Sequence, residues 1–197
     1  MADKRCGWCL STPLYQQYHD AEWGRPVTDD ATLFEFLLLE GAQAGLSWIA
    51  VLNKREGYRK LFDHFDAEKI ARYTPRKIER LLQNQRIIRN RRKVESAVGN
   101  ARAYLALRDA GTSLADFLWQ FGDGRVKVNR FRSLAEVPAS TPESDAMSRA
   151  LKKAGFSFVG STIMYAHMQA TGMVNDHLVT CPGHRRCKEE ARAKNLL

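Results

Sequence analysis

The sequence contains no apolar run long enough to span a bilayer, and no signal peptide or lipidation motif is recognisable in it. It also shows little of the alternation between apolar and polar residues that is typical of β-strands. Internal repeats and low-complexity tracts are absent. These absences argue against an integral membrane protein and against a repeat architecture, and we expect a cytosolic protein built mainly from helices.

Cysteine is scarce, and its four copies lie only near the two ends of the chain, at positions 6, 9, 181 and 187. A disulfide framework forms in oxidising compartments, whereas a cytosolic chain keeps its thiols reduced. Metal binding therefore explains the cysteines better than disulfide pairing does.

Acidic residues are outnumbered, with 22 Asp and Glu against 31 Lys and Arg, which gives a net charge of +9. Most of this excess is local, because residues 76–93 contain eight basic residues and one acid, Glu79. Such a basic patch suits a polyanion, above all nucleic acid. A charge run is, however, more often only a solvated surface.

Helix start signals recur along the chain, each with a capping side chain or a proline for the first turn. These signals are Thr12-Pro13, Asp29-Asp30, Asp66, Thr74-Pro75 and Thr141-Pro142. Residues 33–39 are apolar on almost every side, as in a helix buried within a bundle, and residues 93–107 and 156–168 keep helical spacing. We predict an all-α fold with one domain over residues 1–187 and a charged, flexible tail over residues 188–197.

Two pairs of metal-binding side chains lie at opposite ends of the chain, Cys6 with His19 and His177 with Cys181. Two thiolates and two imidazoles complete a tetrahedral zinc shell and leave no position open for a reacting water. Such a site would be structural and would join the two ends of the chain. Other combinations are open: Cys9, His184 and Cys187 are further donors, and an unliganded set of polar residues is the alternative.

Glu40 directly follows the apolar residues 33–39 and precedes a segment with two glycines and Trp48. A buried carboxylate needs partners, and in a cavity it would bind a cationic or hydrogen-donating ligand strongly. The alternative is that Glu40 caps a helix or forms an ion pair at a helix end.

Aromatic side chains are concentrated in the first part of the chain, beside His19. Flat rings suit the stacking of bases, although about half of such a cluster is expected to be core. The cluster consists of Trp8, Tyr15, Tyr18 and Trp23.

A short break between two predicted helices, residues 81–91, lies inside the basic stretch. A helix-hairpin-helix would hold a DNA phosphate there through backbone N–H groups, with flanking Lys and Arg on the neighbouring phosphates.

Four blocks span almost the whole chain: Arg5-Cys6-Gly7-Trp8, Tyr18-His19-Asp20-x-Glu22-Trp23-Gly24, Leu39-Glu40-Gly41-x-Gln43-Ala44-Gly45-Leu46-Ser47-Trp48, and Gly160-x-Thr162 through Asn175-Asp176-His177. Together they resemble the 3-methyladenine DNA glycosylase I family. The resemblance implies a bacterial helix-hairpin-helix DNA glycosylase with a zinc clamp that joins the N- and C-terminal segments. It also implies a cytoplasmic, nucleoid-associated monomer.

The resemblance implies one structural Zn²⁺ held by four residues, namely Cys6, His19, His177 and Cys181. It places the base pocket at Glu40, Trp48 and Tyr18, with Trp8 and Trp23 close by. Glu40 would recognise the base, and no general base is assigned.

For DNA, the resemblance points to Arg86, Arg89 and Arg91 in the hairpin. Arg86 stands where the family usually has glycine, which serves positions of positive φ, so this chain departs from the family's hairpin at that position. Gln43 and Leu46 are assigned as a wedge into the vacated base stack, and ordinary helix packing is their alternative.

The implied activity is hydrolysis of the N-glycosidic bond of 3-methyladenine in double-stranded DNA, after base flipping, with the free base as product. No lysine stands out in the expected pocket, so a monofunctional enzyme without β-lyase activity is expected. Two other functions compete: a non-catalytic DNA-binding module held together by zinc, and a zinc hydrolase, which the closed metal shell disfavours.

Overall fold

The computed structural model describes residues 4–197 and confirms a mostly helical architecture. The α-helices are α1 (Pro13–Ala21), α2 (Asp30–Gln43), α3 (Trp48–Leu52), α4 (Arg55–Leu61), α5 (Ala67–Ala71), α6 (Pro75–Leu82), α7 (Arg91–Asp109), α8 (Leu114–Trp119), α9 (Pro142–Lys153), α10 (Ser161–Ala170) and α11 (Pro182–Ala193). The shorter elements are the 3-10 turns η1 (Gly7–Cys9), η2 (Asp63–Phe65), η3 (Gln120–Gly122) and η4 (Leu134–Glu136), and the strands β1 (Lys127–Val128) and β2 (Val174–Asn175). No helix within residues 4–197 has the length and apolar character needed to cross a membrane.

The helix starts predicted from the sequence are confirmed. In each case the side chain of the N-cap residue accepts a hydrogen bond from a backbone N–H of the first turn, which satisfies a donor that the helix leaves unpaired. The capping residues are Thr12 of α1, Asp29 of α2, Asp66 of α5, Thr74 of α6 and Thr141 of α9.

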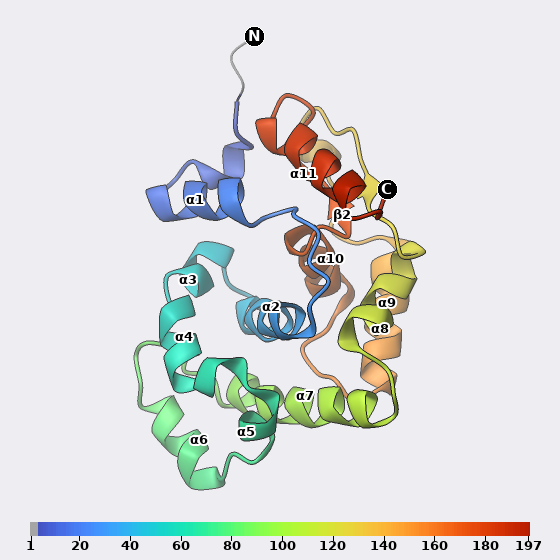
Figure 1. Cartoon of the computed structure of the whole chain (residues 1–197). Helices are drawn as coiled ribbons and strands as arrows, with labels where there is room; N and C mark the ends of the chain where they lie inside the picture. The colour runs from blue at the N-terminus through green and yellow to red at the C-terminus, as the bar shows by residue number, and fades with distance from the viewer. Residues whose placement is uncertain (1–3) are drawn as a thin grey trace.

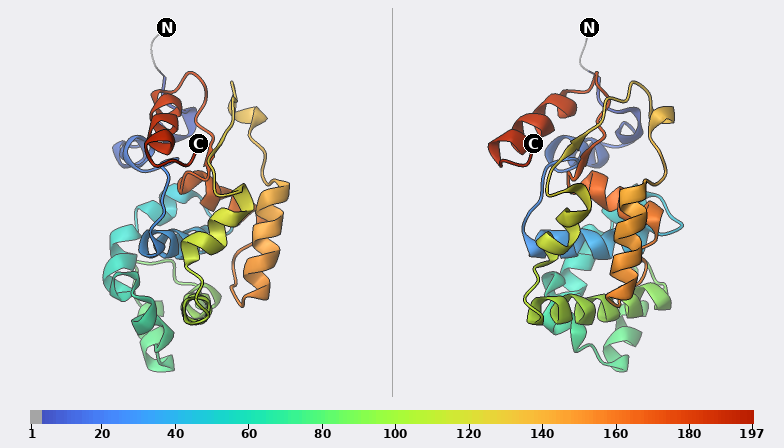
Figure 2. Two further views of the ribbon diagram at one scale, coloured as in Figure 1. Left: turned by 45° about the vertical axis from the view of Figure 1, so that its right-hand side comes forward. Right: turned by 90° about the vertical axis from the view of Figure 1, so that its right-hand side faces the viewer.

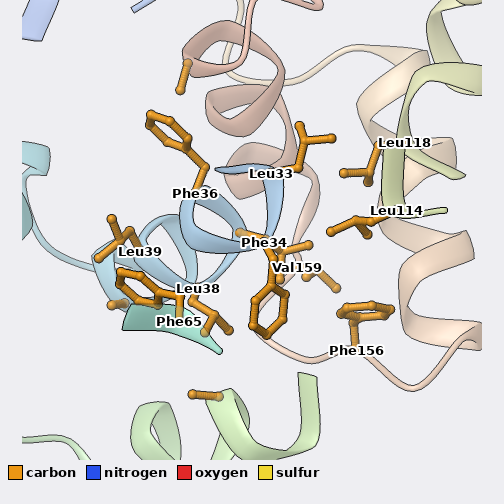
Figure 3. Close-up of a cluster of buried hydrophobic side chains, with 14 of the residues drawn as sticks. Leu33, Phe34, Phe36, Leu38, Leu39, Phe65, Leu114, Leu118, Phe156 and Val159 are labelled. Carbon is orange, nitrogen blue, oxygen red and sulfur yellow. The ribbon is translucent and has the colours of Figure 1, made fainter. Parts of the chain in front are cut away.

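Helix α2 runs through the middle of the molecule, with α1 and α11 towards one end and α5, α6 and α7 towards the other (Figure 1, Figure 2). Its apolar run is buried, and Figure 3 shows side chains of α2 packed among residues of α8 and of the segment before α10. Burying a Leu or Phe side chain contributes about 1.5–3 kcal/mol. The same burial carries Glu40, one turn beyond Phe36, into the interior.

Residues 156–160 depart from the helix expected over 156–168. Helix α10 begins only at Ser161, because Phe158 has a positive φ of 56° and Gly160 has an extended backbone as its N-cap. Apolar spacing alone could not reveal this break, since Phe156 and Val159 are buried in the extended segment as well.

The C-terminal segment also differs from the expected flexible tail over residues 188–197. Helix α11 continues through Ala193, Ala191 is fully buried, and the Leu196 carbonyl accepts a hydrogen bond from the Val126 N–H at 2.7 Å. Charged residues on the outer face of α11 conceal this docking in the sequence. Strands β1 and β2 pair in parallel beside it, with Val128 opposite Asn175.

Candidate functional site

A cavity of about 350 Å³ lies between α1, α2, α10 and the turn η4. Helix α2 contributes Glu40 and Gln43, and Trp48 begins α3. The complete lining is Trp8, Tyr15, Tyr18, Trp23, Glu40, Gln43, Trp48, Leu134, Val137, Ala166, Gln169 and Asp176. All five residues expected to bind a base therefore line one cavity.

Glu40 is 3% exposed and has no hydrogen bond or ion pair to another residue of the described chain. Burial raises the pKa of its carboxyl group to about 8, because the charged form loses its hydration. A helix anchor would have shown a basic or N–H partner. Glu40 is instead left free to meet a ligand that enters the cavity.

Aromatic rings enclose the cavity on several sides. The Trp8 ring lies 4.9 Å from the rings of both Tyr15 and Trp23, and the Tyr18 and Trp48 rings are 5.5 Å apart, measured between centroids. The Trp48 Nε1 atom is buried without a hydrogen-bond partner among the described residues. A buried donor without a partner is costly, so it suits a ligand acceptor.

The side chains of Cys6, His19, His177 and Cys181 meet in a buried cluster whose four donor atoms lie within 4.8 Å of one another. Cys181 Sγ is 3.5 Å from both His19 Nε2 and His177 Nδ1, and Cys6 Sγ is 3.8 Å from His177 Nδ1. A tetrahedral zinc shell separates sulfur and nitrogen ligands by about 3.6 Å. The residues therefore fit a zinc ion in both chemistry and spacing.

Hydrogen bonds outside the cluster orient both imidazoles. His19 Nδ1 lies 2.9 Å from the Asp20 carboxylate, and His177 Nε2 lies 3.0 Å from the backbone carbonyl of Trp23. Each of these oxygens is an acceptor for a ring N–H, so the opposite nitrogen of each ring, the one facing the sulfurs, carries the free lone pair. This arrangement is typical of metal-binding histidines.

The remaining candidate donors lie outside this cluster. The Cys9 thiol donates to the Cys6 carbonyl at 3.1 Å, and His184 Nε2 lies 2.8 Å from the Asn129 carbonyl. Cys187 is buried, and burial raises the pKa of its thiol to about 12. Because Cys187 lies outside the four-residue cluster, its buried thiol packs as a small apolar group.

Residues 43–46 form a type II β-turn between α2 and α3. Ala44 has φ −42° and ψ 119°, Gly45 has φ +74°, and the Leu46 N–H donates to the Gln43 carbonyl at 2.6 Å. Glycine suits the third position because that φ is unfavourable for other residues. The turn leaves Leu46 44% exposed, while Gln43 faces the cavity.

Helices α6 and α7 flank the connection of residues 83–90, which carries two of the expected DNA-binding residues, Arg86 and Arg89. Arg86 and Arg89 are exposed, and their side chains make no hydrogen bond or ion pair within residues 4–197. Arg91 is exposed too, but it pairs with Glu79 at 2.7 Å and with Glu95 at 3.6 Å. The charge of Arg91 is therefore partly compensated.

Arg86 in place of the usual glycine is compatible with this connection, because Arg86 is not among the residues with positive φ. The glycine that matters stands in α4: a Cβ on Gly57 would lie 2.2 Å from the Arg86 carbonyl oxygen. Two further contacts hold the connection. Lys54, the N-cap residue of α4, donates from Nζ to the Gln85 carbonyl at 2.5 Å, and the Ile88 N–H donates to the hydroxyl of Tyr58 in α4 at 3.1 Å.

Asp176 is a cavity residue that the sequence analysis did not assign. Its buried carboxylate accepts hydrogen bonds from Asn129 Nδ2 at 2.7 Å, Tyr165 Oη at 2.6 Å and Gln169 Nε2 at 2.8 Å. Its place directly before His177, in the block Asn175-Asp176-His177, was the available signal. Tyr15, one helical turn from Tyr18, was noted but not placed in the pocket, whereas Leu134, Val137 and Ala166 had no signal in the sequence.

Known proteins resemble this chain over most of its length. The sequence profile of the methyladenine glycosylase family matches residues 8–185. DNA-3-methyladenine glycosylase 1 of Escherichia coli (strain K12) is 52% identical over 185 residues, which is 92% of this chain and 99% of that relative.

Solved structures of 3-methyladenine DNA glycosylase I have the same fold as this chain. A crystal structure of 3-methyladenine DNA glycosylase I, 54% identical, superposes with a TM-score of 0.90 over 91% of this chain and 98% of its own. A Staphylococcus aureus 3-methyladenine DNA glycosylase I, solved to explain its recognition of 3-methyladenine, is 34% identical with a TM-score of 0.89 and covers 93% of this chain and 98% of its own. By sequence and by fold, this chain belongs to the methyladenine glycosylase family.

Proposed function

We propose that the protein is a DNA-3-methyladenine glycosylase of base-excision repair, which hydrolyses the N-glycosidic bond of 3-methyladenine in DNA. Relatives covering almost the whole chain carry this activity in their names. The observation in this molecule that supports it best is the aromatic cavity around Glu40, a buried carboxylate that has no partner within the described chain.

The cavity suits a flat cation. Methylation at N3 gives the adenine of a nucleotide a positive charge, and each aromatic face attracts such a cation by roughly 0.5–2 kcal/mol. A cation beside Glu40 favours the ionised carboxylate, so binding drives a proton off the carboxyl group. Unmodified adenine carries no positive charge to stabilise the buried carboxylate. This difference in charge supplies the selectivity for the methylated base.

The cationic base is already a good leaving group, so the protein has little need of an acid to protonate it. The bond between C1′ and the base nitrogen breaks, and the electron pair leaves with the base, which becomes neutral. Water forms the new bond to C1′ and releases a proton to solvent. Glu40, Tyr18 and Trp48 bind and orient the base during this step, and no lysine lines the cavity to support β-lyase chemistry.

The damaged nucleotide must leave the duplex to reach the cavity. In the proposed complex, residues 83–90 act as the hairpin of a helix-hairpin-helix, with backbone N–H groups and exposed arginines on the phosphates. Leu46, exposed on its type II turn, fills the space that the flipped nucleotide leaves, and Gln43 lies between that turn and the cavity.

Zinc has a structural role in this proposal. A zinc ion would be held by Cys6, His19, His177 and Cys181, and its four protein ligands leave no site for a reacting water. The ion would stabilise the contact between the two ends of the chain.

Release of the free base tests the function directly. The protein is incubated with methylated duplex DNA, and the released bases are separated and identified, with unmethylated duplex as the control. We expect free 3-methyladenine from methylated DNA only. A protein that binds the duplex without releasing any base would instead be the non-catalytic DNA-binding module.

A further inference from the structure

Lys93 makes two hydrogen bonds that its place in a basic stretch did not suggest. Its Nζ donates to the backbone carbonyls of Ala42 at 2.8 Å and Ala44 at 2.6 Å, and the side chain is half-buried. Both carbonyls belong to the C-terminal end of α2, where helical carbonyls lack partners and a positive charge is favourable. The ammonium group of Lys93 therefore binds backbone carbonyls of this protein.

The orientation of the Ala44 carbonyl determines the type of the turn at residues 43–46. Type I and type II turns differ by a rotation of the central peptide, which carries the carbonyl of the second residue. That carbonyl is the one of Ala44, and Lys93 holds it in the type II orientation. Loss of this contact removes a restraint on the peptide that presents Leu46.

Lys93 also stands at a junction. It lies in the first turn of α7, where its backbone N–H donates to the N-cap side chain of Asn90 at 3.2 Å, directly after the connection of residues 83–90. The backbone of Lys93 is thus tied to the connection of residues 83–90, and its side chain is tied to the turn of residues 43–46.

We propose that Lys93 is a positioning residue that fixes the Gln43–Leu46 turn relative to the phosphate-binding connection, so that Leu46 meets the duplex in register. The inference rests on the proposed function, since it requires a duplex with a vacated base position. It predicts that Lys93 affects recognition of the vacated position without itself contacting phosphate.

The test compares two duplexes of equal sequence, one intact and one with a stable tetrahydrofuran abasic analogue. Lys93→Met keeps the length of the side chain and removes the ammonium group. We expect about a tenfold loss of affinity for the abasic duplex, the size typical of losing charged hydrogen bonds, and less than about a twofold change for the intact duplex, within ordinary surface-substitution effects. The slope of log affinity against log salt should stay unchanged.

Arg89→Met is the matched control, because Arg89 is an exposed basic residue of the same stretch whose side chain has no partner within residues 4–197. It should weaken binding of both duplexes and reduce the salt slope by about 0.9. If Lys93→Met behaves in the same way, Lys93 contacts phosphate and the inference is wrong.

Gly45→Ala guards against a simple loss of stability in Lys93→Met. A Cβ on Gly45 would meet no atom of the described residues within 4 Å, so the substitution acts through the φ of +74° in the turn itself. It should reproduce the selective loss on the abasic duplex, and the double variant should lose less than the product of the two single losses. Fully multiplicative losses would overturn the inference, whereas a wild-type protein that releases no 3-methyladenine would overturn the proposed function instead.

Discussion

His177 uses its Nε2 atom to donate a hydrogen bond to the backbone carbonyl of Trp23, over 3.0 Å. The other ring nitrogen of His177 faces Cys181 Sγ, and the Trp23 side chain lines the cavity. Three further cavity residues, Trp8, Tyr18 and Asp176, stand within two positions of a cluster residue in the sequence. The cluster of Cys6, His19, His177 and Cys181 and the cavity are therefore built from the same short stretches of backbone.

The protein should contain one equivalent of zinc, and Cys181→Ser should lower both the metal content and the melting temperature, because it removes one of four ligands. Cys9→Ser is the matched control, since Cys9 is equally buried but lies outside the cluster. Elemental analysis and thermal melts of both variants check this. Full metal content in Cys181→Ser together with loss in Cys9→Ser would show that the ligand set is different.

Removal of the metal should also weaken binding of free 3-methyladenine. Without the ion, His177 is no longer fixed on one side, and the positions of Trp23 and Trp8 in the cavity wall lose their restraint. Calorimetric titration of the chelated protein, at a temperature where circular dichroism shows it folded, measures the effect. Unchanged base affinity in a folded, zinc-free protein would mean that the cavity stands independently of the cluster.

Much of this site could be inferred from the sequence, for a physical reason. Glu40 was expected to be buried because it follows an apolar run within one helix, and that is a local property. The set of Cys6, His19, His177 and Cys181 came from the family resemblance, because metal chemistry alone left Cys9, His184 and Cys187 open as further donors. Asp176 was missed because its hydrogen bonds come from distant residues, such as Asn129, and sequence periodicity carries no trace of such contacts.

The affinity for DNA should fall steeply with salt, because basic side chains that contact phosphates release counterions. Arg89→Met should flatten the slope of log affinity against log salt by about 0.9, the value for one lost phosphate contact. Arg91→Met should have a smaller effect, since Arg91 already pairs with Glu79 and Glu95. Titrations at several salt concentrations compare the two variants, and equal slopes for wild type and Arg89→Met would mean that DNA is held elsewhere.

The sequence could not show that, within residues 4–197, Arg91 is paired and Arg89 is not, because it gives only a total charge for residues 76–93. Glu79 lies twelve positions before Arg91, and their contact depends on how α6 folds back against the start of α7. The docking of α11 was hidden for a different reason, because the residues that it buries, Gly183, Cys187 and Ala191, are small and stand among charged residues.

Glu40→Gln should separate recognition of the base from stability of the fold. The folded protein holds the carboxyl proton up to about pH 8, whereas the unfolded chain releases it near the ordinary glutamate pKa of 4.5. The folded state thus binds more protons between these limits, and wild-type stability decreases as pH rises through this window. One pKa unit corresponds to about 1.4 kcal/mol, so the penalty reaches a few kcal/mol above pH 8.

Glutamine has the same shape and no charge to desolvate, so Glu40→Gln should melt at or above the wild-type temperature, with a gain that grows from pH 5 to pH 8. The same variant should lose about ten- to a hundredfold in the rate of 3-methyladenine excision, because a charge-assisted hydrogen bond to the cationic base contributes about 1.5–3 kcal/mol. Thermal melts across this pH range, beside single-turnover excision assays, measure both effects. A lower melting temperature with undiminished excision would make Glu40 a structural anchor and remove it from the base site.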